Sequence, residues 1–210
     1  MNGFQNQAAR MTAVKKIELG PIDTCRPGKG EVLIQTEYVG ICGSDVHFFE
    51  SGERKGKRFA LPFILGHECS GVIVETGEGV ETLAIGNRVT IEPQQTCGVC
   101  EFCKSGRYNL CAHVAFPSVP PYDGVLRRYF TFPEHLCFHI PPEISSLSAA
   151  LVEPMAVGFQ AARQGEVEIG KSVVILGMGC IGLTTLIACK ARGASRIIAV
   201  DLFEKRLAIA

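Results

Sequence analysis

Hydrophobic and polar residues follow one pattern over most of the chain and a second pattern after Gly170. In the first, short β-rich runs at 12–18, 31–39, 71–75 and 88–92 predict strands, and glycine-containing turns separate them. Many short strands with frequent turns are typical of a barrel-like all-β domain. Residues 1–10 are polar and show no apolar periodicity, so we expect them to form a disordered extension that the fold does not need.

The second pattern predicts a β-α-β unit, preceded by helices at 145–151 and 155–163. Residues 172–176 form an apolar run that predicts a buried strand, 182–192 a helix, and 196–201 a second buried strand, with another helix starting at Glu204. Uninterrupted apolar strands are typical of a parallel sheet covered on both faces. A complete doubly wound dinucleotide domain has about six strands, so the pattern predicts a truncated one.

Composition narrows the possible partners. The chain has 21 basic and 21 acidic residues and no net charge, which disfavours nucleic acid as a partner. Residues 172–189 are uncharged, but glycines and threonines interrupt them, so we expect no membrane span. Ten cysteines in a chain whose first 16 residues contain no apolar leader favour a cytoplasmic, zinc-binding protein over a secreted disulfide-rich one.

A dense group of reactive side chains occupies residues 40–68. Cys42, His67 and Glu68 offer a thiolate, an imidazole and a carboxylate, which are the ligand types of a catalytic zinc site with one position left for water or substrate. Asp45 is expected to orient His67 through its second ring nitrogen. Ser44 and His47 are candidates to pass a substrate proton outward to solvent; the alternatives are a turn-capping hydroxyl and an exposed histidine.

A second metal motif has the spacing Cys97-x2-Cys100-x2-Cys103-x7-Cys111. Four thiolates at this spacing suit a tetrahedral structural zinc that is closed to chemistry. The ferredoxin cluster motif ends instead in x3-Cys-Pro, so an iron–sulfur cluster is disfavoured. Unconnected thiols or two disulfides are the remaining alternatives.

A glycine-rich motif predicts dinucleotide binding. Gly177, Gly179 and Gly182, with Cys180 and Ile181 between them, form G-x-G-x-x-G between a predicted strand and helix. Asp201 follows 19 residues after Gly182 (201 − 182), near the expected distance of about 20. An aspartate there accepts from the ribose 2′-hydroxyl and favours NAD over NADP; Arg206 is the nearby residue that would favour a 2′-phosphate.

Together these motifs resemble the zinc-dependent medium-chain dehydrogenases. Gly-Ile-Cys-Gly-Ser-Asp-Val-His at 40–47, followed by Gly-His-Glu at 66–68, is most similar to the sorbitol (L-iditol 2-) dehydrogenase branch, and the similar part starts at Met11. The resemblance implies a β-rich, GroES-like catalytic zinc domain at 1–153 with a structural-zinc lobe at 93–113. It also implies the first part of an NAD-binding Rossmann domain at 154–210.

The resemblance also implies roles and an activity. Glu153 stands where alcohol dehydrogenases carry a cysteine ligand, so it is expected to bind zinc or hydrogen-bond the substrate; in the sorbitol branch a residue like Glu68 approaches the zinc. The implied enzyme uses two zinc ions per chain and NAD to oxidise a secondary alcohol of a polyol such as sorbitol, xylitol or iditol to the ketose. Relatives are commonly homo-tetramers.

Three alternatives remain open. One is a threonine 3-dehydrogenase or an alcohol dehydrogenase of the same superfamily. The second is a truncated, inactive zinc-binding domain. The third, a zinc-ribbon nucleic-acid module, is disfavoured by the neutral charge and by the second, open metal site.

Overall fold

The protein is described by a computed structural model that covers residues 4–210. The chain divides into two compact units, Met1–Ala150 and Leu151–Ala210, and each is considered by itself. The expected domain boundary after Glu153 falls inside helix α4 (Val152–Gln164), three residues beyond this division.

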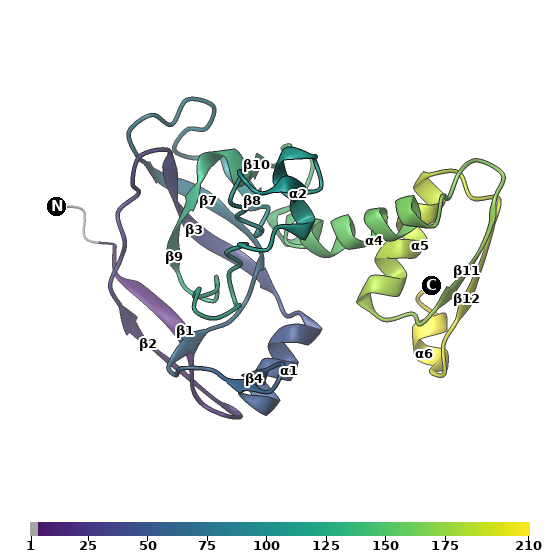
Figure 1. The fold of residues 1–210 in the computed structure, drawn as a ribbon, viewed down its shortest axis with the longest axis horizontal. Helices are drawn as coiled ribbons and strands as arrows, with labels where there is room; N and C mark the ends of the chain where they lie inside the picture. Colours follow the sequence, from purple (N-terminus) through teal and green to yellow (C-terminus); the bar gives the residue numbers. More distant parts are fainter. Residues whose placement is uncertain (1–3) are drawn as a thin grey trace. The chain divides into compact units, whose positions relative to one another are not determined.

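Antiparallel strands form the framework of the first unit (Figure 1). Its strands are β1 (Asn6–Ala13), β2 (Lys16–Ile22), β3 (Glu31–Gly40), β4 (Glu53–Arg54), β5 (Lys57–Arg58), β6 (Phe63–Ile64), β7 (Glu68–Thr76), β8 (Arg88–Ile91), β9 (Tyr129–Pro133) and β10 (Cys137–His139). Its helices are α1 (Gly43–Ser51), α2 (Glu101–Lys104), η1 (Tyr108–Leu110), η2 (Glu134–Leu136) and α3 (Ser146–Ala149).

These strands form a five-stranded sheet in the order β10-β8-β7-β3-β9 and a three-stranded sheet in the order β2-β1-β6. Strand β1 also reaches β9, because the Asn6 side chain exchanges two hydrogen bonds of 2.9 Å with the backbone of Tyr129. A bridge between Ala8 and Arg127 adds to this contact, so the two sheets continue into one another as a barrel does. The main core of the unit consists of Val32, Ile34, Cys69, Ile73, Val89, Ile91, Val125, Phe130, Phe132 and Cys137.

The prediction for the N-terminus was wrong where the structure describes it. Residues 6–10 belong to β1, and Asn6 and Ala8 are buried; residues 1–3 lie outside the described part. The predicted strand at 12–18 is also wrong, because the β1–β2 hairpin turns at Val14 and Lys15, with Lys15 at φ 61°. The first error arose because residues 6–10 carry no apolar periodicity, and the second because the turn at Val14 and Lys15 contains no glycine to mark it.

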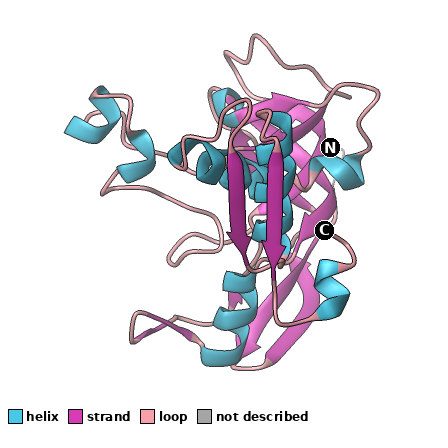
Figure 2. Cartoon of the chain, turned by 90° about the vertical axis from the view of Figure 1, so that its right-hand side faces the viewer, coloured by secondary structure: helices cyan, strands magenta, loops and turns pink. Residues whose placement is uncertain are grey.

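The second unit is a β-α-β unit, as the hydrophobic pattern predicted. It contains α4, β11 (Ser172–Leu176), α5 (Cys180–Ala191), β12 (Arg196–Val200) and α6 (Glu204–Leu207). Strands β11 and β12 pair in parallel (Figure 2). Helices α4 and α5 pack closely, since Gly158 approaches the Thr184 backbone so tightly that a Cβ would lie 2.5 Å from it. Among the described residues, no helix has both the length and the apolarity to cross a membrane.

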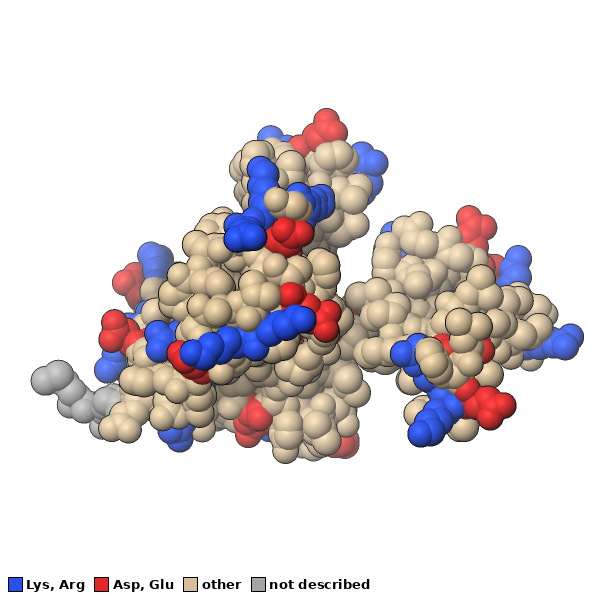
Figure 3. Space-filling model, turned by 90° about the horizontal axis from the view of Figure 1, so that it is seen from below, with Lys and Arg blue, Asp and Glu red and all other residues tan. Residues whose placement is uncertain are grey.

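Charged side chains of both signs are interspersed over the surface. On the face shown in Figure 3, Lys and Arg side chains lie beside Asp and Glu side chains, as the zero net charge leads one to expect. Several ion pairs link them, for example Lys16 with Glu18 and Lys29 with Glu78.

Candidate metal centres and cofactor loop

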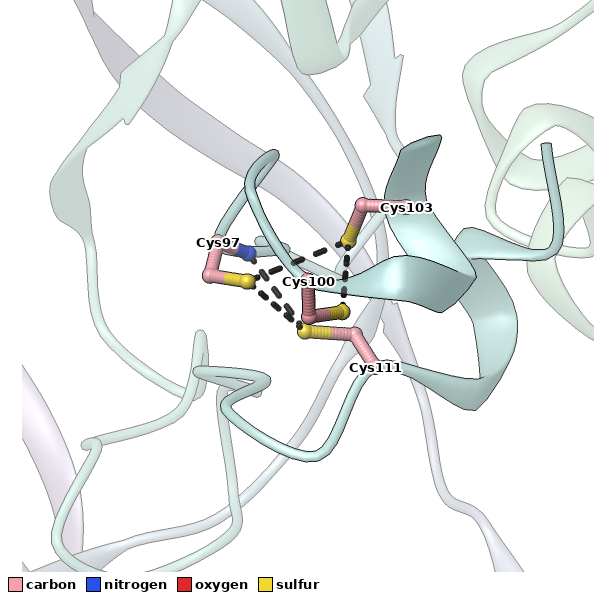
Figure 4. Close-up of side chains that lie close together, drawn as sticks. All are labelled: Cys97, Cys100, Cys103 and Cys111. Atoms are coloured by element: carbon pink, nitrogen blue, oxygen red, sulfur yellow. Dashed lines mark hydrogen bonds between the residues drawn. The ribbon is translucent and has the colours of Figure 1, made fainter. Parts of the chain in front are cut away.

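The four cysteines of the predicted lobe converge on one point. Cys97, Cys100, Cys103 and Cys111 each turn their sulfur inward from α2 and the loops around it (Figure 4). Their Sγ atoms lie 3.5 Å (Cys100 to Cys103), 3.6 Å (Cys111 to Cys97) and 3.9 Å (Cys97 to Cys103) apart. Four sulfur atoms bound tetrahedrally at about 2.3 Å from a zinc ion would lie about 3.8 Å apart. The lobe therefore has the dimensions of a closed zinc site.

Backbone N–H groups around the lobe donate to the sulfur atoms of Cys97 and Cys111, which favours the thiolate form of these two residues. The backbone N–H groups of Val99 and Cys100 lower the pKa of Cys97 to about 6. The backbone N–H groups of Cys97 and His113 donate to the Cys111 sulfur, at 3.5 Å and 3.4 Å. Burial raises the pKa of Cys103 to about 11. A cation among the sulfurs is what would keep all four ionised together, because metal binding requires the thiolate form.

The second cluster is formed by Cys42, His67 and Glu68. One ligand atom from each lies within 4.8 Å of the others. His67 and Glu68 are about 6% exposed and Cys42 is half-buried. Three protein ligands of mixed type are typical of a catalytic zinc site, whereas the four-thiolate set is typical of a structural one.

Local structure explains how residues 25 positions apart in sequence meet. Cys42 is the N-cap of α1, two residues after β3 ends, and His67 directly precedes Glu68, the first residue of β7. Strands β3 and β7 pair antiparallel with Gly40 opposite Glu68. A Cβ on Gly40 would lie 2.2 Å from Glu68 Oε2, so the glycine leaves the space that the carboxylate occupies.

Asp45 lies at the centre of this cluster, with its residue 2% exposed. Its Oδ2 accepts the Cys42 N–H at 3.1 Å, and its Oδ1 accepts the Gly66 N–H at 3.1 Å. His67 Nδ1 is 3.7 Å from Oδ1, which is longer than a hydrogen bond. Nδ1 is buried without a hydrogen-bond partner among the described residues. Asp45 thus holds the backbone beside both ligands, and its predicted role in orienting the imidazole stays a prediction.

A cation at this cluster would offset the effect of burial on the ionisation of its side chains. Burial raises the pKa of the Cys42 thiol, and burial likewise raises the pKa of the Glu68 carboxyl. A divalent cation at this position would reverse both effects, because an opposite charge favours the ionised form. The residues therefore fit the predicted ion, with Nε2 of His67 as the nitrogen that does not face Asp45.

The other predicted site residues do not belong to this three-residue cluster. Ser44 hydrogen-bonds the Cys42 thiol and is half-buried, while His47 is exposed on α1. Glu153 is half-buried in the first turn of α4, in the second unit. Its predicted part in zinc or substrate binding stays a prediction.

The predicted glycine motif forms the turn between β11 and α5. Gly177 has φ 95°, and a Cβ on Gly182 would lie 1.8 Å from the Gly177 carbonyl oxygen, so α5 packs on the strand only without a side chain there. A Cβ on Gly179 would meet nothing within 4 Å, which leaves open space over the backbone. Cys180 and Ile181 begin α5 and are exposed. This loop fits a dinucleotide pyrophosphate.

Asp201 follows β12, as predicted, and faces the glycine loop. Its Oδ2 accepts the Met178 N–H at 2.7 Å, and its Oδ1 accepts the Phe203 N–H at 2.9 Å. These two bonds lower the pKa of Asp201. Arg206 Nη1 lies 3.5 Å from Oδ2, and the Arg206 side chain is half-exposed. Arg206, which could favour a 2′-phosphate, therefore pairs with Asp201, which favours a 2′-hydroxyl.

Sequence reasoning missed two residues of the open cluster. Ser118 donates a 2.6 Å hydrogen bond to Asp45 Oδ1. The Phe116 ring lies against the His67 ring, with centroids 5.3 Å apart. Both lie about 50 residues after His67 in a loop without a recognisable motif. The sequence signals near them are Pro117, Pro120 and Pro121, which mark turns but no site.

Similar proteins share most of this chain. The family model for the alcohol dehydrogenase GroES-like domain matches residues 28–142. A zinc-type alcohol dehydrogenase-like protein of Escherichia coli is 48% identical, over 88% of this chain and 54% of its own length. A D-xylulose reductase A of Aspergillus clavatus is 44% identical, over 91% and 53%. Sorbitol dehydrogenase of Bacillus subtilis is 42% identical, over 96% and 57%. The chain spans about half the length of these relatives.

Solved structures agree with the fold. An Escherichia coli oxidoreductase/dehydrogenase of unknown specificity superimposes with a TM-score of 0.94 at 44% identity, over 98% of this chain and 60% of that one. A zinc-binding dehydrogenase of Sinorhizobium meliloti, bound to NADP, gives 0.89 at 30% identity, over 98% and 59%. An alcohol dehydrogenase of Escherichia coli in complex with NADH gives 0.88 at 28%, over 98% and 59%.

These likenesses confirm the predicted fold class, a GroES-like domain followed by part of a Rossmann domain. They also agree with the predicted branch, because the relatives include proteins named for xylulose and sorbitol. The chain belongs to the alcohol dehydrogenase GroES-like domain family, within the zinc-dependent medium-chain dehydrogenases.

Proposed function

We propose that the protein of which this chain is part is a zinc-dependent dehydrogenase that oxidises a secondary alcohol of a polyol to the ketose with NAD. The observation that carries the proposal is the open cluster of Cys42, His67 and Glu68 beside a second, closed cluster of four cysteines. A closed site alone would suit any zinc-stabilised fold. The open site of Cys42, His67 and Glu68 has the mixed ligand types that are typical of catalytic zinc sites.

The chain's own residues would act in the following way. Cys42, His67 and Glu68 hold the ion, and Asp45 fixes the backbone at both ligand segments. Bound zinc supplies a Lewis acid toward an alcohol oxygen, and NAD supplies the hydride acceptor. Ser44, next to Cys42, accepts the alcohol proton, and His47 on the exposed side of α1 passes it to solvent.

NAD is proposed over NADP because of Asp201. Its carboxylate is held at the loop by two backbone N–H groups and has a lowered pKa, so it is ionised at neutral pH and repels a 2′-phosphate. Related structures hold NADP in one case and NADH in another, so the cofactor is a property of each chain and needs its own test.

A polyol is proposed as the substrate class on two grounds. Relatives are named D-xylulose reductase, sorbitol dehydrogenase and L-idonate 5-dehydrogenase, and each name refers to a compound that carries several hydroxyls. Glu153 is a carboxylate, which accepts hydrogen bonds from neighbouring hydroxyls more strongly than a thiol does. A homo-tetramer and a cytoplasmic location remain predictions from the resemblance.

The test compares sorbitol, xylitol, threonine and ethanol as substrates of the full-length enzyme, with NAD and with NADP. We expect a polyol with NAD to give the highest kcat/KM. Glu153→Cys should lower kcat/KM for the polyol about tenfold or more and leave two zinc ions per chain. Glu168→Gln, an exposed carboxylate beyond the end of the same helix, is the matched control and should change neither value.

Two results would refute parts of the proposal. Faster turnover of threonine or ethanol than of every polyol refutes the substrate class and supports the superfamily alternative. Fewer than two zinc ions per chain, measured by elemental analysis, refutes the pair of metal centres.

A further inference from the structure

A tight turn at residues 116–119 lies against the open metal cluster. The Val119 N–H donates to the Phe116 carbonyl at 3.0 Å, Pro117 stands at the second position, and Ser118 at the third has φ 68°. This is the geometry of a type II turn, whose third position strongly favours glycine because φ is positive there. A serine at this position is strained, so its side chain is expected to provide something that glycine would not.

The Ser118 side chain is buried, and its hydroxyl hydrogen-bonds to residues beside the candidate metal ligands. The residue is 1% exposed. Its hydroxyl donates to Asp45 Oδ1 at 2.6 Å and accepts the Gly66 N–H at 3.0 Å. Ser118 therefore contacts both the carboxylate at the centre of the cluster and the residue that directly precedes His67.

Asp45 depends on this hydroxyl for its orientation. Its Oδ2 accepts from the Cys42 N–H, and its Oδ1 accepts from the Gly66 N–H and from Ser118. The bond from Ser118 is the shortest of the three and comes from outside the two ligand segments. It is the one that can fix the carboxylate relative to both segments at once.

We propose that Ser118 is a positioning residue of the Cys42/His67/Glu68 centre. Its hydroxyl fixes the Asp45 carboxylate, which in turn holds the Cys42 and His67 segments at the spacing that one metal ion requires. The inference rests on the proposed open zinc centre. Partners of metal ligands typically contribute 10- to 100-fold to metal affinity, and a group one step further out is expected at the low end, about tenfold.

The test is zinc release from the full-length, two-zinc protein to a colorimetric chelator. Two phases are expected, a faster one from the open centre and a slower one from the four-cysteine lobe. Ser118→Ala and Ser118→Gly should both accelerate the first phase about tenfold and leave the second unchanged. With cobalt in the open centre, both variants should also shift the visible absorption bands.

The pair of variants separates the hydroxyl from the strain. Serine and alanine both place a Cβ at the positive φ and glycine does not, so an effect of backbone strain alone would appear in Ser118→Gly and be absent in Ser118→Ala. Thr36→Val is the matched control, because it removes a 2.7 Å hydroxyl bond to the Arg127 carbonyl in the same unit without touching a ligand. It should leave both phases unchanged.

Three results would overturn the inference. Unchanged release from both Ser118 variants refutes it while the zinc centre stands. Equal acceleration of both phases shows general destabilisation and also refutes it. A wild-type protein that releases a single zinc refutes the open centre itself, and the inference with it.

Discussion

Replacing Gly40 by alanine tests how the open metal centre is built. Gly40 lies opposite Glu68 in the β3–β7 pair, and an added Cβ would lie 2.2 Å from Glu68 Oε2. Ordinary contact begins at 3.4 Å, so the carboxylate oxygen must move by 1.2 Å (3.4 − 2.2). The Cβ and Cδ atoms of Glu68, at 3.1 Å and 3.3 Å, need to give by only a few tenths of an ångström.

The two possible responses differ in what they cost. Overpacking a rigid core costs about 1–3 kcal/mol. Rotation of a side-chain end costs less stability but removes the carboxylate from its place. Because the closest atom is the end of the Glu68 side chain, we expect rotation. The change should therefore reduce zinc affinity of the open centre about 10- to 100-fold, with a small loss of stability.

Gly43→Ala is the control for this experiment. It lies in the same motif, at the first position of α1, and a Cβ there would meet nothing within 4 Å. Zinc affinity of both variants is measured by competition with a chelator, and stability by thermal unfolding. If Gly40→Ala and Gly43→Ala retain zinc equally, Glu68 is not a ligand or its position does not depend on the glycine, and the reasoning fails.

Three further predictions follow from single contacts. Removing the chain before Met11 should lower the melting temperature by several degrees, because the two buried hydrogen bonds of Asn6 contribute about 1 kcal/mol each; an unchanged melting temperature would restore the idea of a dispensable extension. Gly182→Ala should destabilise the full-length protein, whereas Gly179→Ala should leave its melting temperature unchanged and weaken NAD binding measured by calorimetry; equal effects on stability would contradict the packing seen at the turn. The lowered pKa of Asp201 adds stability that is present above the unfolded pKa of about 3.9 and lost as pH falls through the lower folded value. Asp201→Asn should therefore flatten the acid limb of unfolding below about pH 4, and an unaltered limb would show that this carboxylate is not linked to folding.

The residues that converge in the two candidate metal centres could be picked out from the sequence because they lie in short motifs. The four cysteines lie within 15 residues, and their spacing alone indicates a tetrahedral site. The glycine motif is equally local, and it forms the turn between β11 and α5, with Gly177 at a positive φ and Gly182 against the Gly177 carbonyl. The β-α-β unit was clear because two apolar runs flank a helix that carries one charged residue, Lys190. The predicted burial of the two strands was wrong for this chain, because most of their residues are exposed or half-buried.

Elements that depend on distant partners could not be predicted in the same way. Strand β1 contains one large apolar residue, Met11, and is held by its pairing with β2 and by the hydrogen bonds of Asn6 to Tyr129, 123 residues away. The β1–β2 turn uses Lys15 in a left-handed conformation, without the glycine that would have revealed it. Burial against a distant segment depends on the whole fold, so a local sequence pattern does not predict it.

The same division runs through the open metal centre itself. The identity of the candidate ligands is local, but we propose that their placement depends on Gly40, which leaves room for Glu68, and on Ser118, which bonds Asp45 across 73 residues. Neither residue belongs to the group of candidate ligands. Both act on where oxygen atoms lie, and an error of about 1 Å in a reacting site can cost two orders of magnitude in rate. Substitutions that spare every ligand can therefore still abolish the function, and the two positions identified here are where we expect that to happen.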